Sequence, residues 1–146
     1  MTLFYRSRRV GKKGKLFTLY KFKTLNEGYN NAFVQENAYK PLGHFLRKTK
    51  LDEFPQLINV LKGELTLVGP RPHEPEEVAH YPERFRHIPL AKAGVTGLSQ
   101  VNGASELPFL KELGYDGYYV AHQGILLDLK ILAKTLLIFL FDPTAI

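Results

Sequence analysis

The longest apolar run of the sequence, at residues 125–141, places the strongest limit on the fold. It falls short of the ~18 consecutive apolar residues that a bilayer-spanning helix needs, and Asp128, Lys130 and Lys134 interrupt it. We therefore expect a helix that covers apolar surface of the same chain rather than a membrane span. The residues that recur at helical spacing, and are therefore predicted to face the core, are Ile125, Leu129, Leu132, Leu136 and Phe139.

The elements elsewhere are predicted to be short, because glycine and proline interrupt the chain repeatedly. Gly11 and Gly14 predict the turn of a β-hairpin. Thr49 and Asp52 are both candidate N-caps for the helix that runs to Leu61, and Asp52 is preferred because Pro55 then falls in the first turn. Other expected elements are helices at residues 41–47 and 107–120, a partly helical stretch at 73–86, strands at 64–68 and within 93–103, and a loop at 26–37. Regular strand–helix alternation is absent, so the predicted class is α/β of an α+β-like kind: a small irregular sheet and a hairpin with several short helices, not a Rossmann fold, in one domain over residues 1–146.

The chain is basic, with a formal net charge of +6 and a pI of about 9.5. The segment from Arg6 to Lys23 is rich in lysine and arginine and contains no acidic residue. This balance favours an anionic partner: nucleic acid, anionic lipid or a phosphorylated ligand. The absence of cysteine excludes disulfides and cysteine-based zinc sites, and the histidines lack the spacing of a zinc motif.

Two adjacent carboxylates, Asp52 and Glu53, are the first candidates for chemistry. Arg47, Lys48 and Lys50 precede them, and nearby cations favour the ionised form of a carboxyl group. A carboxylate held ionised in this way can act as a nucleophile or as a metal ligand. The alternative is an acidic first turn that only stabilises its helix, and the residues taken alone favour that alternative.

Two further segments could bind phosphate. Arg71 stands between two prolines after a predicted strand, so a stiff turn would present its guanidinium, which suits bidentate phosphate binding. A rigid surface loop with a solvated arginine is an equal alternative. The glycine-rich segment Gly94–Gly103 could bring backbone N–H groups close to a phosphate, although it lacks the ending of a Walker A loop, and a plain glycine-rich turn is the stronger interpretation.

Taken in order, these segments resemble the bacterial sugar transferase family, also called monotopic phosphoglycosyl transferases, from about Phe4 to Thr135. The Leu-Asp-Glu-x-Pro-Gln motif, followed by Gly-Pro-Arg-Pro at this separation, is highly specific and outweighs the structural alternatives above. The matching blocks are Phe17–Lys23, Leu46–Gly63, Leu67–Pro72, Gly94–Gly103, Asp116–Tyr119 and Leu127–Leu132.

The resemblance implies a two-step transfer of sugar-1-phosphate from a UDP-sugar to polyprenyl (undecaprenyl) phosphate. Asp52 would attack the sugar-linked phosphate, so that UMP leaves and a covalent aspartyl-phosphosugar forms. Glu53 would act beside Asp52, both as ligands of Mg²⁺, and Arg47 and Arg71 would bind substrate phosphates. The further candidates for substrate or nucleotide binding are Lys21, Gln56, Thr96 and Gln100.

The resemblance also implies a place at the cytoplasmic face of the bacterial inner membrane, on anionic lipid, and a role in exopolysaccharide, capsule, O-antigen or glycoprotein glycan synthesis. Family members carry an apolar re-entrant helix just before the Phe4 region, and we expect this chain to lack it and to attach peripherally through amphipathic helices. One alternative is a truncated, inactive or accessory remnant that still docks on the membrane. A basic nucleic-acid-binding module is the weakest alternative, since no such motif is present, and we expect no nucleic acid as partner.

Overall fold

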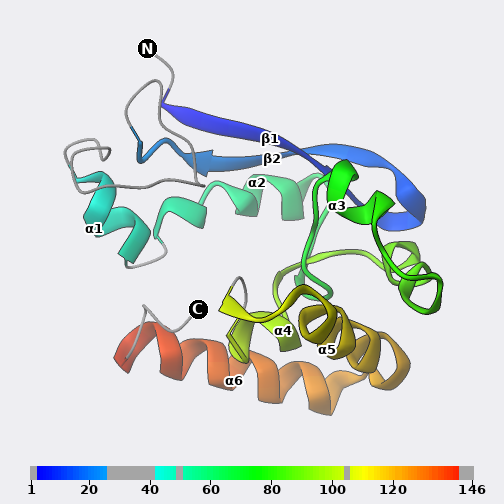
Figure 1. Ribbon diagram of the computed structural model, residues 1–146. Helices are drawn as coiled ribbons and strands as arrows, with labels where there is room; N and C mark the ends of the chain where they lie inside the picture. The colour runs from blue at the N-terminus through cyan, green and yellow to red at the C-terminus, as the bar shows by residue number, and fades with distance from the viewer. Residues whose placement is uncertain (1–2, 26–41, 49–50, 104–105, 142–146) are drawn as a thin grey trace.

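The computed structural model describes residues 3–25, 42–48, 51–103 and 106–141, and its first unit is an antiparallel hairpin (Figure 1). Strand β1, Phe4–Val10, pairs with β2, Leu16–Phe22, in a register that sets Phe4 opposite Phe22 and Val10 opposite Leu16. The 3-10 turn η1, Lys12–Gly14, joins them, with φ of +59° at Lys13 and +79° at Gly14. Glycine adopts this left-handed conformation without steric cost, so the predicted hairpin is confirmed.

The helix that was expected to start at Asp52 starts later. Residues Leu51–Glu53 form the 3-10 turn η3, and α2 runs from Gln56 to Leu61 with Pro55 as its N-cap. The N–H of Phe54 donates to the carbonyl of Leu51, and the N–H of Leu57 donates to the carbonyl of Phe54, both at 3.1 Å, so the hydrogen bonds here span three residues, as in a 3-10 turn. The prediction that Asp52 caps this helix is therefore wrong, and Asp52 lies in the turn that precedes it. Helix α1, Gly43–Lys48, comes before η3 and contacts it.

Two short parallel strands form the second sheet. Strand β3, Thr66–Val68, pairs with β4, Gly94–Thr96, so that their carboxyl ends lie together. A Cβ atom on Gly69 would lie 2.6 Å from the carbonyl oxygen of Lys92, and Cβ atoms on Gly94 and Gly97 would collide with the backbone of Gly69. These glycines are needed for the close approach of two backbones, which agrees with the plain structural interpretation of the glycine-rich segment. The segment between the strands carries α3, Pro75–Ala79, and the 3-10 turns η4, Glu83–Phe85, and η5, Ile88–Leu90.

Three helices form the other side of the molecule: α4, Leu98–Val101, α5, Phe109–His122, and α6, Ile125–Phe141. The short α4 was not expected, because the glycines around it indicated only strand and turns. Figure 1 shows the hairpin and α6 at opposite edges, with α2, α4 and the β3–β4 region between them. This mixture of short helices and two-stranded sheets confirms the predicted α/β class. Among the described residues, no helix combines the length and the apolar character needed to cross a bilayer.

The face that α6 turns to the core matches the prediction at Leu132 and differs from it at Ile125, Leu129 and Leu136. Ile131 is 2% exposed, and Leu127, Leu132 and Ile138 pack with the same cluster, whereas Ile125, Leu129 and Leu136 are exposed. Polar residues select this face: the Tyr119 hydroxyl lies 2.6 Å from Asp128 Oδ1, and the hydroxyls of Thr96 and Thr135 lie 2.8 Å apart. An apolar stripe could not supply these hydrogen bonds, so the inward face of α6 includes Asp128 and Thr135.

Candidate active site

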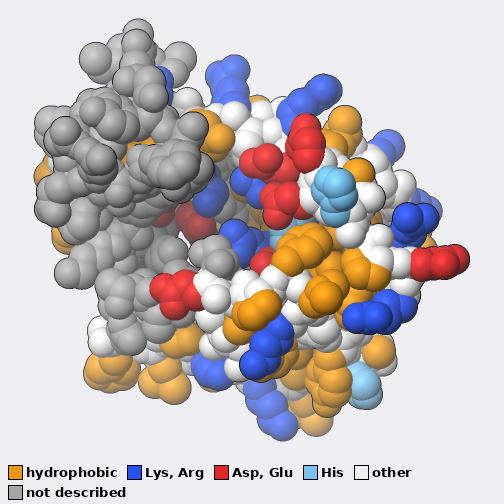
Figure 2. All heavy atoms as spheres, in the orientation of Figure 1, with side chains coloured by type: hydrophobic (Ala, Val, Ile, Leu, Met, Phe, Trp, Pro, Cys, Tyr) orange, Lys and Arg blue, Asp and Glu red, His pale blue; other side chains and the backbone are white. Residues whose placement is uncertain are grey.

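A pocket of about 300 Å³ lies where the hairpin, η3, α2, the carboxyl ends of β3 and β4, and α6 meet. Parallel pairing accounts for part of this arrangement, since it brings the residues that end β3 and β4 to the same edge. Of the residues proposed from the sequence, the pocket lining includes Lys21, Glu53, Gln56, Arg71, Thr96 and Gln100. In Figure 2, acidic and basic side chains meet in the hollow between the upper and lower parts of the molecule.

Asp52 and Glu53 differ in their surroundings, although they share one turn. Asp52 is only 7% exposed and is not part of the pocket lining, whereas Glu53 lines the pocket. The Nζ atom of Lys21 donates to Glu53 Oε1 at 3.0 Å, with both side chains about three-tenths exposed. This ion pair fixes the Glu53 carboxylate against the hairpin, next to the turn that holds Asp52.

Arg71 reaches the pocket from the turn after β3, as the Gly-Pro-Arg-Pro pattern indicates. Pro70 and Pro72 on either side of it are buried, and its side chain remains about a quarter exposed. The backbone N–H of Arg71 donates to Asp116 Oδ2 at 3.3 Å. The side chain of Arg47 lies outside the described structure, although the α1 backbone that carries it contacts η3.

Two parts of the site were missed by sequence reasoning. Arg9 of β1 lines the pocket, and its guanidinium donates to the Pro72 carbonyl at 3.3 Å. Its position in a strand of alternating basic residues gave no reason to single it out.

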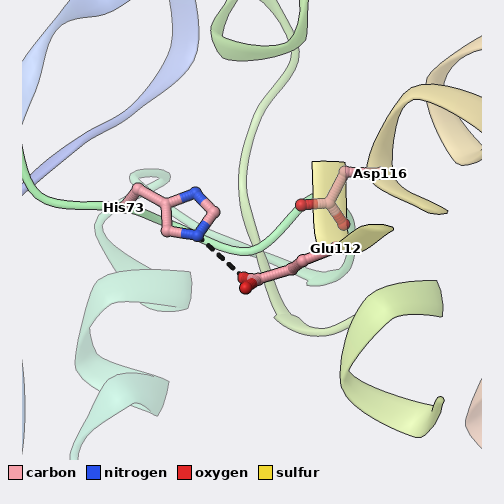
Figure 3. A group of neighbouring side chains, drawn as sticks. All are labelled: His73, Glu112 and Asp116. Carbon is pink, nitrogen blue, oxygen red and sulfur yellow. Dashed lines mark hydrogen bonds and ion pairs between the residues drawn. The ribbon is translucent and has the colours of Figure 1, made fainter. Parts of the chain in front are cut away.

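The other part is a buried cluster of His73, Glu112 and Asp116 (Figure 3). His73 Nε2 lies 2.8 Å from Glu112 Oε1, and Nδ1 is hydrogen-bonded to the Tyr81 hydroxyl. Burial raises the pKa of Asp116 to about 7; the charge of Glu112 adds to the rise, and Ser99 and His73 oppose it. Because His73 and Glu112 are 39 positions apart in the sequence, no local spacing could predict this cluster.

The pocket has an apolar wall as well as a charged one. Leu57 and Phe54 of the η3–α2 segment and Phe139 of α6 line it, and these three side chains are between 38% and 58% exposed. An amphiphilic ligand could therefore place a phosphate against Lys21 or Arg71 and a hydrocarbon chain against these aromatic and aliphatic side chains.

Two groups of residues fit a metal ion by their chemistry. Asp52 and Glu53 offer carboxylate oxygens beside the pocket, the donor type that Mg²⁺ prefers. The cluster of His73, Glu112 and Asp116 offers ligand atoms within 4.8 Å of one another and could also hold a metal ion, but its imidazole nitrogen suits transition metals better than Mg²⁺.

Comparison with known proteins identifies the family of this chain. The family model described as bacterial sugar transferase matches residues 1–142. The sugar transferase EpsL of Bacillus subtilis is 40% identical over 91% of this chain and 67% of its own length. An undecaprenyl-phosphate galactose phosphotransferase of Salmonella typhimurium is 36% identical over 90% of this chain, and a UDP-glucose:undecaprenyl-phosphate glucose-1-phosphate transferase of Xanthomonas campestris is 35% identical over 98% of it. The chain spans only 32% of the length of each of these two relatives. With a match over nearly all its residues, and with the motif residues of β2, η3, α2 and the β3 turn gathered at one pocket, this chain belongs to the bacterial sugar transferase family.

Proposed function

We propose that the pocket is the active site of a phosphoglycosyl transferase that moves sugar-1-phosphate from a UDP-sugar to polyprenyl (undecaprenyl) phosphate. One observation carries the proposal: an acidic turn, a lysine, two arginines and four amide or hydroxyl side chains line a single pocket that also has an apolar wall. Phosphoryl transfer requires positioning and charge neutralisation above all, and this set of residues can supply both.

The chemistry proceeds in two steps. A carboxylate oxygen of Asp52 attacks the sugar-linked phosphorus, the bond from that phosphorus to the bridging oxygen breaks, and UMP leaves with the bridging oxygen. A phosphate oxygen of the polyprenyl phosphate then attacks the same phosphorus and displaces the Asp52 carboxylate, which gives a polyprenyl diphosphate sugar. Asp52 is buried within the η3 turn, so a small rearrangement of that turn is needed to bring its carboxylate to the substrate.

The remaining residues bind and neutralise. Arg71 and Lys21 face the diphosphate, and Lys21 also holds Glu53 in place. Gln56, Thr96 and Gln100 offer hydrogen bonds to the nucleotide or the sugar. Mg²⁺, when bound by Asp52 and Glu53, would neutralise charge on the diphosphate.

The outer face of α6 suits peripheral attachment to the cytoplasmic face of the bacterial inner membrane. Leu126, Leu137 and Leu140 on this helix are 55% to 73% exposed, and Lys130 and Lys134 lie among them. Figure 2 shows hydrophobic and basic side chains side by side along the lower edge, where α6 runs. Apolar side chains can enter the lipid boundary while lysines reach anionic headgroups.

The test is transfer of labelled sugar phosphate from UDP-glucose or UDP-galactose to undecaprenyl phosphate in vesicles. We expect release of UMP without the lipid acceptor and a hydroxylamine-sensitive adduct of sugar phosphate on Asp52. Asp52→Asn should abolish both, whereas Glu76→Gln, a change of similar size at an exposed position of α3, should leave both unchanged. Activity of Asp52→Asn at the level of the unmodified chain would rule out the covalent route. An inert but folded chain that still binds vesicles would favour the accessory alternative.

A further inference from the structure

Arg71 is held in place by two acidic residues that the proposed reaction does not use. Its Nη1 atom lies 3.5 Å from Glu112 Oε1, and its backbone N–H donates to Asp116 at 3.3 Å. One side chain thus fixes the guanidinium and another fixes the backbone that carries it. Both carboxylates come from α5, one helical turn apart, and both point toward the loop after β3 (Figure 3).

His73 completes this arrangement from the same loop as Arg71. It lies between Glu112, at 2.8 Å, and the Tyr81 hydroxyl, so the Glu112 carboxylate contacts both an arginine and a histidine. His73, Glu112 and Asp116 are 3%, 5% and 0% exposed. Burying several ionisable groups costs free energy unless they form hydrogen bonds or ion pairs with one another. Apolar side chains of the same volume would be buried at a lower free-energy cost. Apolar packing alone therefore gives no reason for the charges at these positions.

We infer that Glu112, Asp116 and His73 form a positioning network, called here the Arg71 support, which fixes the Arg71 guanidinium at the pocket wall for phosphate binding. This inference rests on the proposed role of the pocket. The long arginine side chain loses rotamer freedom when it binds a ligand, and a carboxylate that already fixes it removes part of that cost before the ligand arrives. The three residues are positioning residues, because their contacts are with Arg71 and with one another.

The effect of a Glu112 substitution on anion affinity has opposite signs under this inference and under simple electrostatics. Removing the negative charge of Glu112 should strengthen binding of an anion if charge alone matters, because a like charge near the site disappears. If the Arg71 support positions the guanidinium, Glu112→Gln should instead weaken binding. The size expected for one charge-assisted contact is roughly 10-fold in affinity.

The experiment is a double-mutant cycle on the full chain, with UDP as the probe and calorimetry as the measurement. Glu112→Gln should weaken UDP binding roughly 10-fold when Arg71 is present and have little effect in an Arg71→Ala background. Glu76→Gln, which removes an exposed acidic charge from α3, is the matched control and should leave UDP affinity unchanged. Tighter UDP binding by Glu112→Gln, or an equal loss in both backgrounds, would overturn the inference.

A second measurement covers a variant that does not fold. In the unmodified chain, the Arg71 Nε–Hε group should give an ordered NMR signal without ligand, identified by its loss in Arg71→Lys. An NMR signal averaged by free rotation of the side chain would contradict the positioning role. A transition metal bound stoichiometrically to the purified chain, and lost in His73→Asn, would also contradict it, because the cluster would then be a metal site. The two proposals can be refuted separately. If UDP binding shows the expected coupling between Glu112 and Arg71 but no sugar is transferred, only the proposed function is refuted. If sugar is transferred but the coupling is absent, only the Arg71 support is refuted.

Discussion

Replacing Asp116 with asparagine should change how the stability of the protein depends on pH. Asp116 is 0% exposed, and burial raises its pKa from 3.8 to about 7. In the unfolded chain the same group ionises near its ordinary pKa. The folded state therefore binds the proton more tightly, and the stability contributed by this group falls as pH rises from about 4 to about 7, then levels off.

The magnitude follows from the size of the pKa shift. A rise of about three units corresponds to about 4 kcal/mol in total, of which roughly 2 to 3 kcal/mol falls between pH 5 and pH 8. The amide that Asp116→Asn introduces resembles the protonated acid and does not titrate, so this variant should gain about that much relative to the unmodified chain over this interval. Neighbouring groups such as His73 are present in both proteins, and comparing the two removes most of their effect.

The assay is urea unfolding of both proteins at pH 5 and pH 8, at constant ionic strength. We expect the variant to be the more stable protein by roughly 1 to 2 kcal/mol at pH 5 and by about 4 kcal/mol at pH 8. Glu76→Gln, at an exposed acidic position, should follow the unmodified chain at both pH values. If the unmodified chain and Asp116→Asn lose or gain stability in parallel, the buried carboxyl group does not titrate in this range and the reasoning is refuted.

Three further outcomes test the packing and the membrane face. Asn59→Ala should lower the free energy of unfolding by about 2 to 3 kcal/mol in urea titrations, because this fully buried amide donates to a carbonyl of β2 at 2.6 Å and leaves it unsatisfied when removed. Tyr119→Phe should cost about 1 to 3 kcal/mol in the same assay, and Asp128→Asn should reduce that cost, since the Tyr119 hydroxyl lies 2.6 Å from the Asp128 carboxylate. Leu136→Ser, on the exposed face of α6, should weaken sedimentation with anionic vesicles several-fold without changing the melting temperature. Leu110→Ser, similarly exposed on α5, should have little effect on sedimentation. Equal binding by both variants would exclude α6 as the membrane face.

Local chemistry determined what could be predicted well. The hairpin follows from the turn residues around Gly14, and the stiff turn at Arg71 follows from the prolines that flank it, because these conformations depend on the nearest few residues. The Leu-Asp-Glu-x-Pro-Gln and Gly-Pro-Arg-Pro motifs likewise identified the family from residue order alone. The start of α2 was misplaced even though it is local, because the residues after Asp52 make 3-10 hydrogen bonds, and a capping pattern does not distinguish these from the first turn of an α-helix.

Contacts between distant segments decided the rest. The inward face of α6 was predicted from apolar periodicity alone, yet Asp128 and Thr135 turn inward because Tyr119 and Thr96 supply hydrogen bonds there. The buried cluster beside Arg71 joins the loop after β3 to α5, and His73 and Glu112 are 39 positions apart in the sequence. Periodicity in a sequence indicates which apolar side chains are buried. A buried polar side chain is stable only beside a hydrogen-bond partner, and the tertiary structure alone determines where that partner lies.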